Sequence, residues 1–264
     1  MSTRSSSAGF PGAAVFGQVG RITALFLAVG RGAFRRPFQV REFLYQSWFF
    51  ASVTILPTAL VSIPFGAVVA LQLGSLTQQI GAQSFTGAAS GLAIVQQASP
   101  LVTALLVAGA GGSAVCADIG ARTIREEIDA MEVLGVDPIQ RLVVPRVLAA
   151  IFVAVLLNGM VSVVGMVGGY AFNVLVQDGT PGAYLASFSA LAQLPDLAVS
   201  SIKAVLYGLV AGVIAADRGL HPKGGPKGVG DAVNQSVVIT FLVLFLINVV
   251  LTGIYLQVVP PKLS

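Results

Sequence analysis

Long apolar segments that carry no charge alternate along this chain with short charged segments. Asp, Glu, Lys and Arg are absent from residues 43–117 and again from residues 147–177. About 20 mainly apolar residues cross a bilayer as a helix. The pattern therefore predicts an all-α membrane protein with five spanning helices, at residues 51–73, 100–116, 147–176, 197–216 and 233–259. The uncharged but polar residues 74–99 are expected to form an outer loop with a short helix.

Prolines and glycines interrupt the predicted spans. Pro57 and Pro64 fall inside the first span, where each removes a helical hydrogen bond that neighbouring protein groups must replace. Pairs of glycines four residues apart permit close helix packing, although the spacing is also common in apolar sequence without that role. Two such pairs occur, Gly165 with Gly169 and Gly208 with Gly212.

The region before the first span divides into two parts. Residues 1–12 are polar and rich in Ser and Gly, without the apolar core of a signal peptide, so we expect a disordered tail. Residues 13–50 combine helical periodicity with arginines beside aromatic residues, a mixture typical of helices anchored at the headgroup level. We therefore predict interfacial or elbow helices at 13–50, and a membrane domain at 51–264.

A dense charged segment separates the second and third predicted spans. Ile124, Ile128, Met131 and Leu134 recur at helical spacing and share one face. Gly135 supplies a helix stop, and a turn at Pro138 follows. The pattern predicts a short amphipathic helix at about 121–135, with i,i+4 ion pairs Arg122–Glu126 and Arg125–Asp129. A solvated loop helix without further function is the alternative reading.

The distribution of basic residues predicts the topology. Thirteen of the 15 Lys and Arg residues lie in the N-terminal arm, in the charged segment or in residues 217–231. The two intervening loops have none. The positive-inside rule therefore places the N-terminus and the amphipathic helix in the cytoplasm and the C-terminus outside. We expect a multi-pass protein of the inner (plasma) membrane.

Several kinds of chemistry have no support in the sequence. It lacks the G-x-x-x-x-G-K-[ST] motif that holds nucleotide phosphates, so the chain is not expected to hydrolyse ATP or to bind a cofactor itself. A single cysteine, Cys116, and a single histidine, His221, do not form a metal site, and no basic patch indicates nucleic-acid binding. Lys203 is the one charge well inside an apolar segment. Snorkelling to the outer headgroups is favoured for it over a role in gating or in binding a substrate headgroup.

The charged segment also carries a pattern, E-E-I-D-A-M-x-x-L-G-x-D-P-x-x-x-L-V-x-P-R-x-x-A, that resembles the signature of the MlaE/YrbE permeases. These are the membrane subunits of lipid-transporting ABC systems that work with MCE-domain proteins. The resemblance covers the layout from about residue 38 to the C-terminus, and the composition is similar to the actinobacterial YrbE branch. The matching positions are Glu126, Glu127, Asp129, Ala130, Leu134, Gly135, Pro138, Leu142, Val143, Pro145, Arg146 and Ala149.

The resemblance implies roles for three sets of residues. As a coupling helix, the segment would engage an ATPase through Glu126, Glu127, Ile128, Asp129, Met131, Leu134 and Gly135, the acids meeting basic residues and Ile128 and Met131 filling an apolar groove. A joint of Pro138, Pro145 and Arg146 would set the angle at which this helix meets the third span, the alternative being a plain turn with an anchoring arginine. A cavity between two permeases would be lined by Leu60, Ile63, Phe65, Val69, Leu73, Phe245 and Tyr255, each of which could equally be an ordinary lipid-facing or core residue.

The implied machine contains a second YrbE-type permease, a cytoplasmic ATPase that binds ATP and Mg²⁺, MCE-domain proteins and membrane lipids. Its cargo would be a fatty acid, a mycolic acid or a sterol, and its direction import, but the sequence selects neither. Two other functions remain open, a secondary transporter with its own gradient coupling and a membrane scaffold that transports nothing. The first would need titratable groups inside the spans.

Overall fold

The computed structural model describes residues 11–33, 39–177, 179–192 and 194–258, and the described part is almost entirely helical. Five of its helical segments are long and apolar enough to cross a membrane, which confirms the predicted fold class. Residues 1–10 of the predicted tail lie outside the described residues. The α-helices are α1 (Pro11–Ala33), α2 (Val40–Gln79), α3 (Thr86–Ala93), α4 (Ser99–Leu106), α5 (Gly112–Ile124), α6 (Glu127–Val133), α7 (Val144–Val176), α8 (Pro181–Leu191), α9 (Leu194–Leu220) and α10 (Gly225–Val258).

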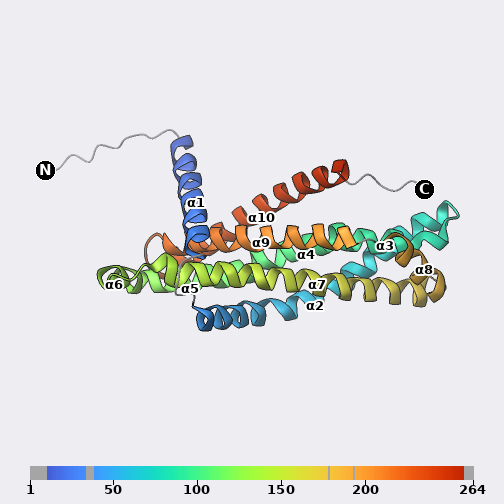
Figure 1. The fold of residues 1–264 in the computed structure, drawn as a ribbon, viewed down its shortest axis with the longest axis horizontal. Coiled ribbons are helices and arrows are strands. Elements are labelled where there is room, and N and C mark those ends of the chain that lie inside the picture. The colour runs from blue at the N-terminus through green and yellow to red at the C-terminus, as the bar shows by residue number, and fades with distance from the viewer. Residues whose placement is uncertain (1–10, 34–38, 178, 193, 259–264) are drawn as a thin grey trace.

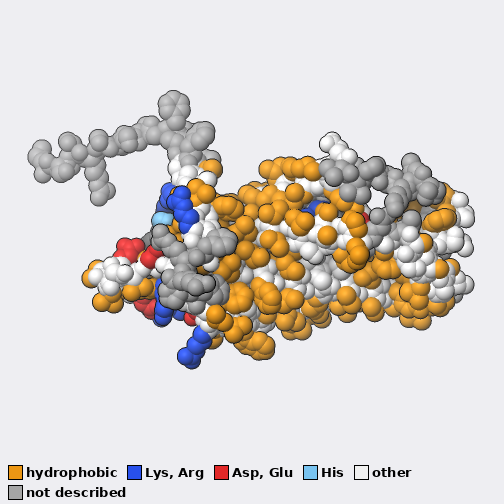
Figure 2. All heavy atoms as spheres, in the orientation of Figure 1, with side chains coloured by type: hydrophobic (Ala, Val, Ile, Leu, Met, Phe, Trp, Pro, Cys, Tyr) orange, Lys and Arg blue, Asp and Glu red, His pale blue; other side chains and the backbone are white. Residues whose placement is uncertain are grey.

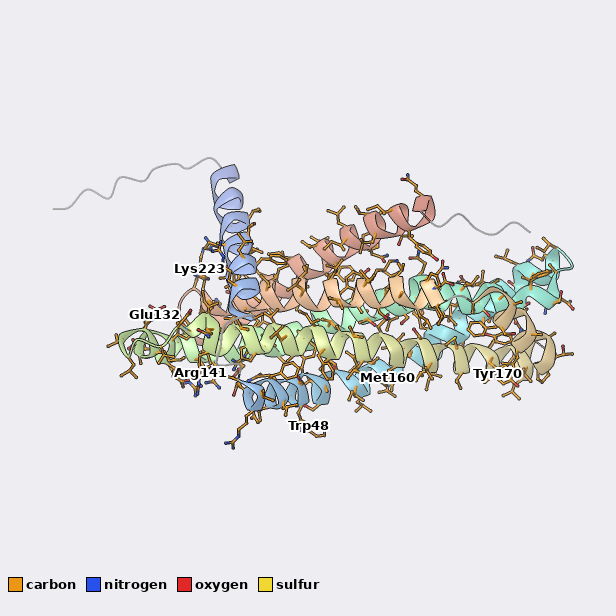
Figure 3. The ribbon with its side chains drawn as sticks, viewed as in Figure 1. Trp48, Glu132, Arg141, Met160, Tyr170 and Lys223 are labelled. Atoms are coloured by element: carbon orange, nitrogen blue, oxygen red, sulfur yellow. The ribbon has the colours of Figure 1, made fainter. Side chains whose placement is uncertain are left out.

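The long helices α2, α7 and α9 pack side by side, with α6 at one end of the bundle and α3 and α8 at the other (Figure 1). Helix α1 crosses the bundle near the α6 end, and the C-terminal half of α10 diverges from α9 (Figure 1). Figure 3 shows Glu132 and Arg141 at the α6 end and Tyr170 toward the α8 end. The crossing direction of α1 is that of an interfacial helix, although its place at the membrane surface stays a prediction.

Helix α2 is longer than the first predicted span. Its 40 residues begin at Val40 and continue without a break through the segment assigned to an elbow helix. Pro57 and Pro64 both stay inside it. Thr54, Thr58 and Ser62 donate their hydroxyls to the carbonyls of Phe50, Thr54 and Thr58, one turn earlier in the same helix.

The second membrane segment is also longer than predicted. It runs from Gln83 to Ile124 and includes π-helical turns at Ile94–Ala98 and Val107–Gly111, whereas the sequence suggested an outer loop over 74–99. Some of the polar residues of this stretch bond to one another or to other helices, whereas Gln78, Gln79, Gln83 and Ser84 are exposed. Thr77 and Thr86 share a hydrogen bond of 2.7 Å, and the Ser90 and Tyr184 hydroxyls lie 3.0 Å apart. The predicted short helix is α3, whose buried hydroxyl groups join the bundle, and the turn at Gly81 before it is exposed.

Both glycine pairs mark close helix contacts, as predicted. Gly165 packs against Gly66 of α2 so tightly that a Cβ at Gly66 would overlap the Gly165 carbonyl oxygen. On α9, a Cβ at Gly208 would lie 2.6 Å from the Ala150 carbonyl oxygen, and one at Gly212 would lie 3.1 Å from the Cα of Val147. The two pairs set the spacing of α7 against its neighbours on both sides.

Candidate functional site: a coupling element braced to three helices

The helix predicted at 121–135 is divided in two. Helix α5 ends at Ile124, and α6 occupies only Glu127–Val133. Between them Glu126 adopts a left-handed backbone conformation with φ of 59°, which is rare for a residue other than glycine. The Glu126 amide donates to the Thr123 carbonyl oxygen, and its own carbonyl accepts from the Ala130 amide, both at 3.0 Å. The left-handed residue interrupts the helix, so α6 does not continue along the axis of α5.

The interruption also changes the ion pairs. Arg122 lies 3.4 Å from Asp118 and 3.5 Å from Glu127, and Arg125 lies 3.1 Å from Glu127. The predicted pairs Arg122–Glu126 and Arg125–Asp129 do not form, because they require one uninterrupted helix. All these groups are partly exposed, so each pair contributes at most about 1 kcal/mol.

The faces of α6 differ from those predicted. Ile128 is buried with an exposed fraction of 7% and joins the main core, and Met131 packs beside it. The break at Glu126 turns Ile128 toward a groove beside α1 and α9, and Met131 is partly buried. The exposed apolar residues are instead Val133 and Leu134, with exposed fractions of 87% and 78%. Gly135 follows with φ of 75° and ends the helix as predicted.

The tip of α6 is therefore acidic and apolar together. Its exposed acids are Glu126, Asp129 and Glu132, and the exposed apolar residues Val133 and Leu134 follow directly in the chain. Figure 2 shows acidic and apolar side chains gathered at this end of the molecule. This surface of α6 is complementary to a partner groove that has apolar residues at its base and basic side chains at its edges.

Arg146 fixes the start of α7 to α5. Its side chain is 1% exposed, and its Nη2 and Nε atoms lie 2.5 and 3.2 Å from Asp118 Oδ2. The Nη1 atom donates to the Leu142 carbonyl oxygen at 2.8 Å. The sequence indicated Arg146 as part of a joint but gave no role to its partner. In the sequence, Asp118 is an acid at the end of a long apolar segment, and Arg146 follows 28 residues later at the start of the next one. That placement was the only sequence signal for the ion pair.

The other predicted joint residues begin helical segments. Pro145 stands in the first turn of α7, where its missing amide is tolerated. Pro138 precedes a π-helical turn at Ile139–Val143, and Asp137 caps this turn by accepting from the Ile139 amide at 2.9 Å. The chain thus enters α7 through a defined turn, and Arg146 holds that turn against α5.

A third contact ties the end of α5 to α9. The Thr123 hydroxyl donates to the Gly219 carbonyl oxygen at 2.9 Å, and a Cβ at Gly219 would lie 2.9 Å from the Cys116 carbonyl oxygen. The ends of α5, α7 and α9 that lie next to α6 are therefore fastened to one another.

Lys203 lies inside the bundle, which corrects the snorkelling interpretation. Its side chain is 2% exposed, and Nζ donates to the Gln96 carbonyl oxygen at 3.1 Å and to the Thr252 hydroxyl at 2.9 Å. The same cluster contains Asp196, which accepts from the Gln96 amide at 2.9 Å and from the Tyr255 hydroxyl. Buried acceptors on two other segments hold the ammonium group more favourably than a stretch to the headgroups would. The cluster connects α9 to the diverging end of α10.

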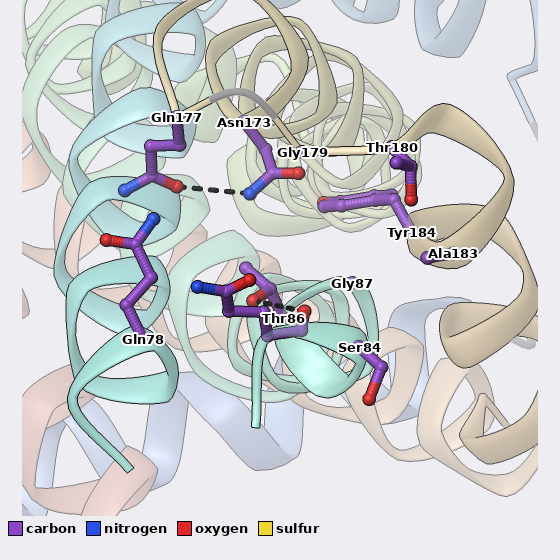
Figure 4. A pocket seen from close by; sticks show the side chains of 11 residues that line it. Gln78, Ser84, Thr86, Gly87, Asn173, Gln177, Gly179, Thr180, Ala183 and Tyr184 are labelled. Carbon is purple, nitrogen blue, oxygen red and sulfur yellow. Dashed lines mark hydrogen bonds between the residues drawn. The ribbon is translucent and has the colours of Figure 1, made fainter. Parts of the chain in front are cut away.

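A small polar pocket of about 230 Å³ lies at the α8 end, between the end of α2, the start of α3 and the end of α7 (Figure 4). Its walls carry uncharged amides and hydroxyls, including Gln78, Thr86, Asn173 and Tyr184. Asn173 donates to Gln177 at 3.1 Å. Burial raises the pKa of the Tyr184 hydroxyl, which therefore stays neutral. The pocket offers hydrogen bonds without charge.

Comparison with known proteins identifies the family. The model for the family described as Permease MlaE matches residues 43–254. The chain belongs to the MlaE permease family. It is 33% identical to a probable ABC transporter permease of Synechocystis over 75% of this chain and 76% of that protein. It is 29% identical to a probable ABC transporter permease of Rickettsia typhi over 92% and 94%. It is also 30% identical, over 68% and 51%, to the chloroplastic protein TRIGALACTOSYLDIACYLGLYCEROL 1 of Arabidopsis thaliana.

The match covers the coupling element, its bracing residues and nearly all of α2 to α10, and it leaves α1 outside. This MlaE permease is thus a multi-pass membrane subunit of an ABC transporter. Of the residues proposed to line its cavity, Leu60, Ile63, Phe65 and Phe245 are exposed on α2 and α10, and Val69 and Leu73 are partly exposed. Tyr255 instead donates to Asp196 in the internal cluster.

Proposed function

We propose that this permease moves lipids across the cell envelope and is driven by a separate ATPase that docks on α6. The observation that carries the proposal is the acidic and apolar tip of α6, fastened at its base to three helices. Asp118 and Arg146 join α5 to α7, and Thr123 joins α5 to α9. A docking tip with such a base transmits force into the bundle, whereas a solvated loop helix would not need it.

A lipid cargo agrees with the surfaces of α2 and α10. These are the least buried of the five spanning segments, and both present large apolar side chains outward. A second permease of the same kind would cover these faces, most simply as a heterodimer, and enclose a lipid between the two subunits. The Arabidopsis relative carries the name of a lipid, trigalactosyldiacylglycerol.

The complete transporter in this proposal has the N-terminus and α6 in the cytoplasm and the C-terminus outside, in the inner membrane. The partner ATPase supplies the ATP and Mg²⁺ sites, and MCE-domain proteins receive or deliver the cargo on the outer side. The direction we propose is import of a fatty acid, mycolic acid or sterol. The membrane topology in this proposal is supported by the positive-inside rule, because 13 of the 15 basic residues lie in segments placed in the cytoplasm.

The docking step is tested by substitution at the tip. Leu134→Arg and Asp129→Arg each place a cation where the proposal needs an apolar or acidic contact, and neither residue is buried. Glu127 is less suitable, because it already pairs with Arg122 and Arg125. Co-purification of the ATPase with the tagged permease should be lost in both variants and kept in Leu175→Arg, an exposed residue at the end of α7. Retention of the ATPase by both tip variants would refute docking at α6.

Transport itself is tested with the purified complex in vesicles. Transfer of a labelled fatty acid or sterol should require ATP and should stop when the permease carries Leu134→Arg. A non-transporting scaffold would show neither transfer nor lipid-stimulated ATP hydrolysis. A secondary transporter would move the lipid without ATP when a proton or sodium gradient is applied, and that result would also overturn the proposal.

A further inference from the structure

Helix α1, the end of α9 and the start of α10 enclose two adjoining pockets near the α6 end. The first, of about 670 Å³, is lined by Arg21, Arg218, Lys223, His221 and Asp231 among others. The second, of about 510 Å³, is apolar and is lined by Ile22, Phe26, Val213, Ile214, Ile239 and Val243 with few polar groups. Gln18 of α1 lines both, so the two pockets meet beneath α1.

The change from polar to apolar lining follows the axes of α9 and α10. On α10 the polar pocket ends at Gln235, and the apolar pocket uses Ile239 and Val243, about 6 and 12 Å further along the helix at 1.5 Å per residue. On α9 the order is the same: Arg218 near the end of the helix lines the polar pocket, and Val210 about two turns earlier lines the apolar pocket. A lipid of the leaflet on the α6 side presents its headgroup and its chain in this order.

The polar pocket is suited to a negative headgroup. It has three permanently charged cations and one acid in its wall, and the second acid nearby, Asp217, is 2% exposed and already shared by Arg21, Arg218 and His221 at 3.7 to 4.0 Å. Lys223 has no ion pair or hydrogen bond within the described residues. Lys223 also lies beside α1 in Figure 3, and basic side chains gather there in Figure 2.

We propose that these two pockets form one binding site for an anionic phospholipid of the cytoplasmic leaflet, with its phosphate among Arg21, Arg218 and Lys223 and an acyl chain between α1, α9 and α10. The site is distinct from the proposed cargo cavity, because it shares no residue with the α2 and α10 faces assigned there. A bound lipid would connect α1 to α9 and α10 across a pocket that the protein itself leaves open.

The test uses fluorescence quenching by lipids brominated on their acyl chains. The variant Trp48→Phe/Phe26→Trp moves the single tryptophan to the rim of the apolar pocket, and Trp48→Phe/Leu156→Trp places it on an exposed face of α7, outside both proposed lipid sites, as a control. The full-length protein is reconstituted in bilayers that contain phosphatidylcholine and phosphatidylglycerol, with one or the other brominated. We expect the indole at position 26 to report a preference of about fivefold or more for the anionic lipid, and the control indole to report little.

Charge variants decide whether the headgroup pocket causes the preference. Arg21→Gln/Lys223→Gln should lower the ratio close to one, and Lys223→Gln alone, on an exposed residue, should lower it partly. Arg31→Gln/Arg41→Gln removes the same charge from other exposed positions and should leave the ratio unchanged. Equal quenching by both lipids, or a ratio unaffected by Lys223→Gln and by the double variant, would overturn the proposal. So would loss of the preference on addition of inorganic phosphate at matched ionic strength, which would indicate a site for soluble phosphate.

Discussion

The ion pair between Asp118 and Arg146 leads to an asymmetric prediction about stability. Arg146 is 1% exposed, whereas the side chain of Asp118 is 32% exposed and also pairs with Arg122. Asp118→Asn leaves a buried cation without its counterion, and breaking a buried pair in this way costs about 3 kcal/mol. Arg146→Met removes the buried charge and leaves Asp118 with Arg122 and with water. We expect this second change to cost only about 1 kcal/mol, for the hydrogen bonds lost.

The double variant Asp118→Asn/Arg146→Met makes the prediction sharper. It contains no unpaired buried charge, so we expect it to cost about 1 kcal/mol, about 2 kcal/mol less than Asp118→Asn alone. The costs of the two single changes would sum to about 4 kcal/mol, so the coupling energy is about 3 kcal/mol, as found for residues in direct contact. Unfolding in mixed micelles of dodecyl maltoside and dodecyl sulfate, followed by circular dichroism, gives the free energy of each variant. If Asp118→Asn proves no less stable than Arg146→Met, or if the two changes add independently, the bracing assigned to this pair is refuted.

Three further predictions concern other features of the bundle. Gly66→Leu should prevent normal assembly of α2 on α7, seen as loss of monodisperse protein on gel filtration, whereas Gly159→Leu, which has open space around it, should not. Glu126→Gly should raise the stability of the protein by about 1 kcal/mol by relieving the left-handed conformation, whereas Glu132→Gly inside α6 should lower it by about as much; equal effects of the two would contradict the strain at Glu126. Lys203→Glu should strongly destabilise the protein in thermal unfolding because it adds a second carboxylate to the cluster of Asp196, and a tolerated substitution would favour a snorkelling lysine after all.

Hydrophobic periodicity predicted the number of membrane segments and the glycine contacts, because both follow from local spacing. It did not predict where the segments end. The residues from Val40 to the first predicted span resemble a separate elbow helix, yet they belong to α2. Residues 83–99 are polar enough to resemble a loop, yet they continue into the second membrane segment. Their side chains find partners on distant segments, such as Tyr184 for Ser90. A single sequence does not reveal those partners.

The charged segment shows the same limit in the candidate site. Its periodicity predicted a short amphipathic helix between two membrane segments, but the outward face of that helix was assigned from a continuous helix. One residue in a left-handed conformation, Glu126, moves Ile128 into the core and leaves Val133 and Leu134 exposed. The partners of Lys203 were equally hidden, since Gln96 and Thr252 are 107 and 49 residues away in the chain.

The lengths of α2 and α7 have a consequence for the far side of the membrane. At 1.5 Å per residue, their 40 and 33 residues measure about 60 and 50 Å, whereas the hydrocarbon layer is about 30 Å thick. Both helices must therefore tilt or project beyond the hydrocarbon layer. At the α3 and α8 end the exposed polar side chains of Gln78, Gln79, Gln83 and Ser84 favour projection into water. The amide-lined pocket of Asn173 and Gln177 then stands above the bilayer, where an external protein can reach it without entering the lipid.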